Sequence, residues 1–252
     1  MAVSFRLDGR CALVTGAGRG LGQAMAVALA EAGADIAGVY ITDIEETRSR
    51  IEATGRRFTA IRQDLRDAAA ARRVVEQAVG AMGRLDILIN NAGIIRRADA
   101  IDFTEGDWDD VIDVNLKSVF FLAQAAARQF LAQGNGGKVV NVASVLSFQG
   151  GIRVASYTAS KGGVLGLTRI LANEWAAKGI NVNAIAPGYM ATANTAPLRA
   201  DAARSAEILA RIPAGRWGQP EDLAGAVVFL CSPASDYVHG SVIAVDGGWL
   251  AR

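Results

Sequence analysis

A tyrosine and a lysine four residues apart, Tyr157 and Lys161, are the side chains of this sequence best suited to acid–base chemistry. On a helix this spacing places both side chains on one face. A phenol has a pKa near 10 and exchanges protons poorly at neutral pH, but an ammonium beside it favours the phenolate and lowers that pKa. Lowering it to about 7 needs roughly 4 kcal/mol of differential stabilisation. The pair is therefore predicted to pass a proton to or from a carbinol oxygen.

A glycine-rich turn near the start of the chain could hold phosphate. It runs from Thr15 through Gly16, Gly18 and Gly20 to Gly22, between a short apolar run and an alanine-rich segment. Glycines at a strand-to-helix turn let the backbone approach a pyrophosphate, and the helix N-terminus favours its negative charge. The strict Gly-x-Gly-x-x-Gly fingerprint is not met because position 21 is Leu. The location of the turn after the first strand nevertheless predicts dinucleotide binding.

Four side chains bear on which dinucleotide would bind. A carboxylate at the end of the second strand would bind the adenosine ribose of NAD, but the expected position holds Tyr40. Asp43 could reach the ribose or cap the following helix. Arg19 could pair with the 2′-phosphate of NADP or contact solvent, and Asp64 could accept a hydrogen bond from adenine or cap a turn. NAD is the preferred prediction, with NADP as the alternative.

Further polar residues are expected where later strands end. Asn90 to Gly93 follow the fourth apolar run, and Ser144 follows the fifth. Ligands of open α/β sheets bind at the carboxyl ends of the strands. Asn115 falls inside a long helical pattern, where an amide competes with helical hydrogen bonds, so it is either a solvated position or an inward-facing anchor.

Short β-branched runs alternate with amphipathic segments along the whole chain, which predicts the elements that must position these side chains. The predicted strands are 11–15, 35–41, 58–62, 87–90, 138–142, 181–186 and 241–245. The predicted helices are 20–32, 43–54, 68–82, 108–133, 156–178 and 220–230. This alternation predicts an α/β fold with a single Rossmann-type, doubly wound domain over residues 1–252, in which helices cover both faces of a seven-stranded parallel sheet. The strand-free stretch 187–219 is predicted to be a substrate lid.

These motifs, in the order in which they occur along the chain, resemble those of the short-chain dehydrogenase/reductase family over essentially the whole sequence. The resemblance implies that Tyr157 is the general acid/base, that Lys161 lowers its pKa and holds the nicotinamide ribose, and that Ser144 binds the substrate carbonyl. Asn115 would support a water that leads protons from Lys161 to solvent. Cofactor contacts are predicted at Gly16, Arg19, Gly20, Leu21, Gly22, Tyr40, Asp64, Leu65, Asn91, Ala92, Gly93, Tyr157, Lys161, Pro187, Gly188 and Thr192.

Longer phrases, at 91–97, 147–153, 186–192, 211–218 and 246–252, are similar to one subfamily. Its members interconvert 2-keto-3-deoxygluconate and 2,5-diketo-3-deoxygluconate, usually with NAD(H), and are typically homotetramers. Such a sugar-acid substrate carries a carboxylate, which arginine grips as a fork. We expect at least one of Arg96 and Arg153 to bind it. The predicted substrate-binding residues are Ser144, Gln149, Arg153, Arg96, Tyr189 and Met190.

The composition of the chain excludes several other classes. The 26 Lys and Arg balance 25 Asp and Glu, so no general attraction to nucleic acid or to an anionic membrane is expected. The N-terminus lacks a signal-peptide pattern, and Cys11 and Cys231 lie in apolar contexts typical of reduced, structural cysteines. The predicted location is the cytoplasm. A serine-hydrolase triad is excluded because His239 is the only histidine, and no Cys/His cluster suggests a metal site.

Two other functions fit part of the pattern. An NADPH-dependent 3-oxoacyl-carrier-protein reductase shares most of these motifs and also carries an arginine in its glycine turn, but it would need a basic surface for its acidic carrier. A Rossmann protein that only senses the dinucleotide could lose the tyrosine or the lysine, whereas both are present here.

Overall fold

In the computed structural model, which describes residues 3–67 and 69–252, the described strands form one seven-stranded parallel sheet in the order β3-β2-β1-β4-β5-β6-β7. The strands are β1 (Cys11–Thr15), β2 (Asp35–Tyr40), β3 (Phe58–Arg62), β4 (Ile87–Asn90), β5 (Gly137–Val142), β6 (Ile180–Pro187) and β7 (Val242–Val245). The predicted fold class is confirmed, and each strand lies within one residue of its predicted bounds.

The central strands are apolar along their length because helices cover both of their faces. In β1 all five residues are buried, and successive side chains point to opposite faces. Val14 packs in one hydrophobic cluster with Met25 and Leu29 of α1 (Gly20–Glu31). Leu13 packs in a second cluster, with Val74 of α3 (Ala70–Met82).

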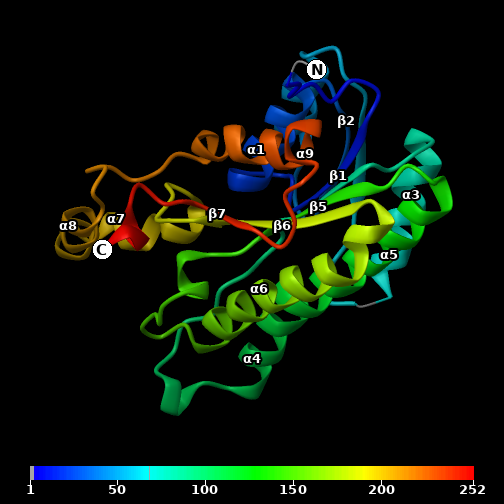
Figure 1. Ribbon diagram of the computed structural model, residues 1–252. Coiled ribbons are helices and arrows are strands. Elements are labelled where there is room, and N and C mark those ends of the chain that lie inside the picture. Colours follow the sequence, from blue (N-terminus) through cyan, green and yellow to red (C-terminus); the bar gives the residue numbers. More distant parts are fainter. Residues whose placement is uncertain (1–2, 68) are drawn as a thin grey trace.

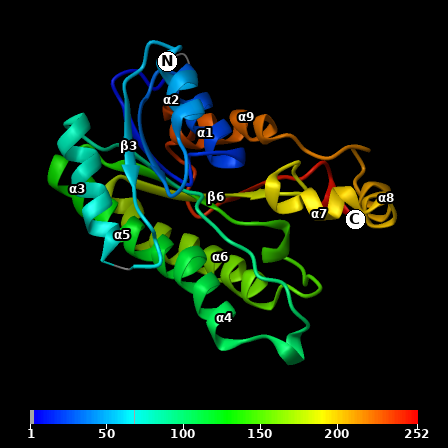
Figure 2. The ribbon, with the colours of Figure 1, turned by 180° about the vertical axis from the view of Figure 1, so that it is seen from behind.

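Figures 1 and 2 show how the helices divide between the two faces. Helix α1 lies with α2 (Glu45–Glu52) and α9 (Ala224–Cys231) on one side of the sheet. On the other side, α3, α5 (Ser118–Gln133) and α6 (Ala155–Trp175) lie along the sheet, and α4 (Glu105–Ile112) packs against α6.

The helix predicted at 108–133 differs from the structure. Helix α4 begins earlier, at Glu105, because the hydroxyl of Thr104 caps it by accepting a hydrogen bond from the backbone N–H of Asp107 at 3.2 Å. A π-helical turn, Asp113–Lys117, then separates α4 from α5 and contains Asn115. The helix predicted from residue 68 is observed from Ala70, and Ala68 itself lies outside the described residues.

The strand-free segment after β6 contains two short helices, α7 (Ala196–Ala200) and α8 (Ala202–Arg211). Both views place these helices beside the C-terminus, at one end of the molecule (Figures 1 and 2). The C-terminal residues Trp249–Ala251 form a single helical turn there. The segment predicted to be a lid is thus built from short helices rather than from an irregular loop.

The order of the strands fixes where a ligand can enter. From β1 the chain continues to β2 and β3 on one side, then crosses to β4 on the other side of β1. In open α/β sheets a crevice forms at this reversal, outside the carboxyl ends of the strands. The glycine turn after β1 and Asn91 after β4 therefore lie next to each other, and Ser144 lies after the neighbouring strand β5.

Candidate active site

The turn after β1 is a preformed cradle. Gly16 and Gly20 adopt positive φ angles of +66° and +57°, which favour glycine. A Cβ at Gly22 would overlap the carbonyl oxygen of Gly16, so the turn closes only without a side chain there. The Thr15 hydroxyl accepts hydrogen bonds from the backbone N–H groups of Asn91 and Ala92, at 2.9 and 3.0 Å. These bonds fix the turn against the end of β4.

Helix α1 starts inside this turn, and its N-cap residue Arg19 makes no side-chain capping bond. The residues that carry the first helical N–H groups, Gly20 to Gly22, line a cleft of about 820 Å³. Uncapped N–H groups at the N-terminus of a twelve-residue helix attract anionic oxygens. The turn and the helix together fit the pyrophosphate of a dinucleotide.

The sequence left open whether Asp43 reaches the adenosine ribose or caps the following helix, and the hydrogen bonds of Asp43 decide this. The Asp43 carboxylate accepts hydrogen bonds from the N–H groups of Ile44 and Glu45, at 2.6 and 3.1 Å, and so caps the start of α2. Tyr40 and Arg19 line the cleft instead, and Arg19 is exposed. The adenosine end of the cleft has no carboxylate from β2.

Asp64 also lines this end of the cleft, after β3. Its carboxylate pairs with the Arg66 guanidinium and accepts a hydrogen bond from the backbone N–H of Arg66 at 3.0 Å. The side-chain bond from Arg66, followed by the backbone bond, holds the pKa of Asp64 below its usual value. Asp64 therefore caps its own turn, which is one of the two roles that the sequence left open.

Helix α6 brings Tyr157 and Lys161 to the cleft, as their spacing predicts, and Ser144, two residues after the end of β5, lines the same cleft. The Lys161 ammonium is buried, lies 5.7 Å from the centroid of the Tyr157 ring, and donates a hydrogen bond to the carbonyl of Val142 at 2.6 Å. Burial lowers the pKa of Lys161 to about 8.

The pKa of Tyr157 differs from the sequence-based expectation. It is raised above its ordinary value because burial disfavours the phenolate, while the hydrogen bond with Ser144 and the charge of Arg97 act in the opposite direction. The expected lowering by Lys161 was wrong for this arrangement, since the Lys161 Nζ is directed at the Val142 carbonyl. Ser144 and Arg97 are the groups that favour the phenolate here.

Asn115 is fully buried in the π-helical turn, which makes it the inward-facing alternative of the two considered. Its amide oxygen accepts from the N–H of Ile94 at 2.8 Å, and its amide nitrogen donates to the carbonyl of Ile94 at 2.9 Å. The same nitrogen donates to the Ser160 hydroxyl at 3.3 Å. Asn115 thus ties the loop after β4 to α6, one residue before Lys161.

The predicted site residues divide into two groups in the structure. Every predicted cofactor residue lines the large cleft, and so do Ser144, Arg96 and Met190. Gln149, Arg153 and Tyr189 do not line it. The side-chain amide oxygen of Gln149 accepts a hydrogen bond from Arg211 of α8 at 3.1 Å, and Tyr189 packs against Trp217 and Trp249.

The two arginines predicted to bind a carboxylate already contact protein carboxylates. Arg96 pairs with Asp107 at 3.2 Å and with Asp110 at 2.8 Å, and Arg153 pairs with Asp99 at 3.1 Å. Arg153 also adopts a left-handed φ of +63°, which is rare outside glycine. These side chains connect the loops around the site to each other.

Arg97 and Arg199 are the arginines that the sequence reasoning missed. Neither lies within ion-pair distance of a carboxylate in residues 3–67 or 69–252. Arg97 is near enough to Tyr157 for its charge to affect the pKa of the phenol, and it donates to the carbonyl of Asn194 at 3.1 Å. Arg199 lines the cleft and donates to the carbonyl of Thr192 at 3.1 Å. Arg97 follows Arg96 directly, so position alone could not tell the two apart.

Comparison with known proteins agrees with this geometry. A family model described as enoyl-(acyl carrier protein) reductase matches residues 16–250. The chain is 63% identical to 2-dehydro-3-deoxy-D-gluconate 5-dehydrogenase of Escherichia coli (strain K12) over 249 residues, which cover 99% of this chain and 98% of that protein. The chain belongs to the short-chain dehydrogenase/reductase family. The resemblance found in its motifs is confirmed.

Two other members of the short-chain dehydrogenase/reductase family are informative. The 2-dehydro-3-deoxy-D-gluconate 5-dehydrogenase of Dickeya dadantii (strain 3937) is 64% identical over 249 residues, with 99% of this chain and 98% of that protein covered. A crystal structure of gluconate 5-dehydrogenase from Burkholderia cenocepacia J2315, in complex with NADP and tartrate, has a TM-score of 0.93 at 43% identity and covers 98% of each chain. These relatives are dehydrogenases, and the prediction of an oxidoreductase that acts on CH–OH groups is confirmed. None of the described helices is both long and apolar enough to cross a membrane.

Proposed function

We propose that this chain oxidises the C5 hydroxyl of 2-keto-3-deoxygluconate to the ketone, and catalyses the reverse reduction, with NAD(H) as cofactor. The observation that carries the proposal is the convergence of Ser144, Tyr157 and Lys161 on one cleft. Relatives about two-thirds identical carry the name of this activity. A 2-deoxygluconate would react at its C3 hydroxyl in the same way.

The protein positions the substrate and moves one proton. The substrate oxygen lies between the Ser144 hydroxyl, which donates a hydrogen bond to it, and the Tyr157 phenolic oxygen. When bound, nicotinamide supplies the hydride acceptor for oxidation and the donor for reduction. In oxidation Tyr157 takes the hydroxyl proton as the carbonyl forms, and in reduction it returns that proton. Lys161 holds the nicotinamide ribose, and Asn115 keeps the loop of residues 91–97 against α6.

Arg97 binds the substrate carboxylate in this proposal. A guanidinium without a carboxylate partner can offer two parallel N–H groups to an acid. Arg97 is exposed in the loop after β4 and does not itself line the cleft, but its charge reaches Tyr157. Arg96 and Arg153 instead hold the surrounding loops through Asp110 and Asp99.

NADP(H) should be accepted beside NAD(H). Asp43 is engaged at the start of α2, so no β2 carboxylate repels a 2′-phosphate at Tyr40. Arg19 is exposed at that edge of the cleft and can pair with the phosphate. The solved gluconate 5-dehydrogenase relative holds NADP.

Assays of reduced nicotinamide with the two cofactors and two substrates test the function. We expect turnover of 2,5-diketo-3-deoxygluconate with NADH, slower turnover with NADPH, and little reaction with an acetoacetyl thioester. Arg97→Ala should raise KM for the acid by about a hundredfold, because a charged hydrogen-bonded partner is lost from the substrate. Arg169→Ala, on the exposed side of α6, is the matched control. Activity confined to NADPH and the thioester would replace this function with that of an oxoacyl reductase.

The proposal also covers the domain organisation, the location and the assembly of the chain. Residues 1–252 would act as one domain with 187–219 as the substrate lid, since Met190 to Thr195 and Arg199 line the cleft. The chain would work in the cytoplasm, where buried free cysteines such as Cys11 and Cys231 are usual. It would form a homotetramer, because Phe121 and Leu131 of α5 and Ile170 of α6 are large apolar side chains left exposed.

A further inference from the structure

The C-terminal segment, Asp246–Arg252, contacts both ends of the lid segment. At the first end, the N–H of Gly188 donates to the carbonyl of Val245 at 3.0 Å, and a Cβ on Gly188 would lie only 2.6 Å from Cα of Asp246. At the second end, the N–H of Ala214 donates to the carbonyl of Gly247 at 3.0 Å. The Arg252 guanidinium also donates to the carbonyl of Ala210, in α8, at 2.7 Å.

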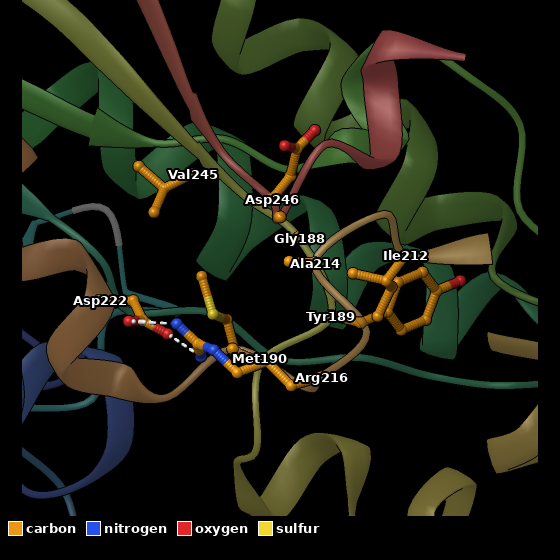
Figure 3. A pocket seen from close by; sticks show the side chains of 11 residues that line it. Gly188, Tyr189, Met190, Ile212, Ala214, Arg216, Asp222, Val245 and Asp246 are labelled. Carbon is orange, nitrogen blue, oxygen red and sulfur yellow. Dashed lines mark hydrogen bonds and ion pairs between the residues drawn. The ribbon is translucent and has the colours of Figure 1, made fainter. Parts of the chain in front are cut away.

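A small cavity of about 200 Å³ lies between these contacts. Figure 3 shows Tyr189 and Ile212 on one side of it, Asp246 and Val245 at another, and Met190 beside the ion pair of Arg216 with Asp222. Met190 lines both this cavity and the large cleft. A shift of the lid at this point would therefore move a wall of the candidate active site.

Trp249 is the side chain through which the C-terminal segment holds the site. It is only 3% exposed and shares a hydrophobic cluster with Val145, Ile208 and Ile212. Its ring centroid lies 4.6 Å from that of Tyr189, and the Arg211 guanidinium carbon lies 4.1 Å from it. The Asp246 carboxylate fixes the turn that presents it, by accepting from the N–H groups of Gly248 and Leu250, each at 2.9 Å.

Through these contacts Trp249 is connected to three residues that were predicted to bind substrate. Val145 directly follows Ser144, Arg211 bonds Gln149, and Tyr189 directly precedes Met190. None of the three depends on the glycine turn, which lies at the other end of the cleft. We propose that the C-terminal segment is a clasp for the lid, and that Trp249 is a positioning residue that sets the substrate side of the site without touching the substrate. This inference rests on the proposed sugar-acid activity.

The clasp predicts a separation between substrate and cofactor effects. Trp249→Ala should raise KM for 2-keto-3-deoxygluconate by about tenfold or more and lower kcat, because small displacements of positioning groups are costly. The dissociation constant of NADH should stay within about twofold of wild type, a change well under 1 kcal/mol, because most of the predicted cofactor contacts lie at the glycine turn and at or just after the ends of β2, β3 and β4 rather than in the lid. Trp249→Leu, which keeps more apolar volume, should show the same split if the alanine variant folds poorly.

Conservative and matched variants separate positioning from general packing. Trp249→Phe should keep the wild-type KM, because an aromatic ring remains at this position. The indole N–H that is lost is buried without a hydrogen-bond partner among the described residues. Trp175→Ala, which removes a half-buried tryptophan at the far end of α6, should lower stability but leave KM unchanged. An unchanged KM in Trp249→Ala and Trp249→Leu, or equal losses of substrate and cofactor affinity, would refute the clasp.

Limited trypsin digestion tests the clasp independently of the substrate. Exposed arginines at Arg199, Arg204 and Arg211 offer cleavage sites within the lid. Trp249→Ala should be cut there about tenfold faster than Trp175→Ala, because local opening exposes the lid. Equal cleavage rates would contradict the clasp. A wild type without activity on the sugar acid would reject the proposed function alone, because the digestion still decides the clasp.

Discussion

In the proposed mechanism, acid–base chemistry depends on the proton affinity of Tyr157, which burial and two side chains influence. Burial raises the pKa of the phenol, and Ser144 and Arg97 oppose that effect. Oxidation needs the phenolate as proton acceptor, so its rate should rise with pH into the alkaline range. Reduction needs the protonated phenol and should fall over the same range.

Variants of the supporting side chains should move this pH profile in a defined direction. Ser144→Ala and Arg97→Ala each remove an influence that lowers the pKa of Tyr157, so both profiles should shift to higher pH. Tyr157→Phe should lower kcat by about 10²–10⁴-fold at every pH while NADH binding persists. The measurements are kcat/KM from pH 6 to about 10, within the range in which a perturbed tyrosine titrates, and fluorescence titration with NADH. A shift to lower pH in either variant would contradict this account.

Lys161 should cost the protein stability while serving its function. Its pKa falls from 10.5 to about 8 on folding, so between these values the unfolded chain binds more protons than the folded one. The free energy of unfolding should therefore rise with pH from about 8 to 10.5, and the destabilisation should be complete below pH 8. We expect Lys161→Met to be inactive yet more stable at pH 7 by about 1–2 kcal/mol, since relief of the buried charge is partly offset by the Val142 carbonyl left without its donor.

Urea unfolding of Lys161→Met and wild type at pH 7 and pH 10 measures this effect. The difference between the two proteins should shrink at the higher pH, where the lysine is neutral in the folded state. A variant that is less stable than wild type at pH 7 would show that the Lys161 ammonium stabilises the fold.

At the scale of elements, local patterns predicted strands better than helix ends. The apolar run at 87–90 coincides with β4, because a buried parallel strand needs little beyond continuous hydrophobicity. The run at 58–62 coincides with β3, although this edge strand is only partly buried. The start of α4 was missed although Thr104 and Asp107 carry a readable capping signal. The π-helical turn at Asn115 has no such signal, since it exists to aim one amide at Ile94, a contact made only in the folded chain.

The residues of the candidate site also divide into those that the sequence pattern could locate and those that it could not. Most of the predicted cofactor residues lie at strand ends, which the alternating pattern locates, and all of them line the cleft. The arginines could not be sorted, because their partners are distant in sequence. Asp110 pairs with Arg96, Asp99 pairs with Arg153, and only folding leaves Arg97 without a carboxylate partner among the described residues.

Asn115 joins two elements, and its removal should affect catalysis more than its contribution to stability suggests. Asn115→Ala leaves the backbone N–H and carbonyl of Ile94 without their partners, which should cost about 2 kcal/mol of unfolding free energy. The loop that carries Arg97 would loosen, so kcat should fall by at least about tenfold.

Asn181→Ala is the matched control for this change. Asn181 is also buried and donates to backbone carbonyls, those of Asp236 and Val238, both at 3.0 Å, but it lies at the amino end of β6, away from the site. It should lose a similar amount of stability with kcat unchanged. Thermal melting and initial rates give both values, and a parallel loss of kcat in the two variants would assign Asn115 a purely structural role.

At the scale of the whole molecule, the two ends of the cleft are formed by different parts of the chain. The cofactor end is formed by the sheet, through the turn after β1 and its bonds to β4. The substrate end is formed by segments that lie outside the sheet, the lid and the C-terminal residues, which gather at one end of the molecule (Figure 1). Differences among relatives in substrate can therefore arise at the lid while the cofactor end is kept.

The outer helices lead to a prediction about assembly. Phe121 of α5 is 36% exposed and Ile170 of α6 is 47% exposed, and apolar side chains of this size on a helix surface are typical of contacts between subunits. Symmetric assemblies repeat each contact, so one introduced charge is placed in every copy of an interface. Phe121→Glu should therefore shift the protein from the proposed tetramer to smaller species in sedimentation velocity. Ile101→Glu changes a residue that is 94% exposed in a short helical turn before α4, and it should leave the proposed tetramer intact. A wild type that sediments as a monomer, or a tetramer that survives Phe121→Glu, would place the subunit contacts elsewhere or exclude them.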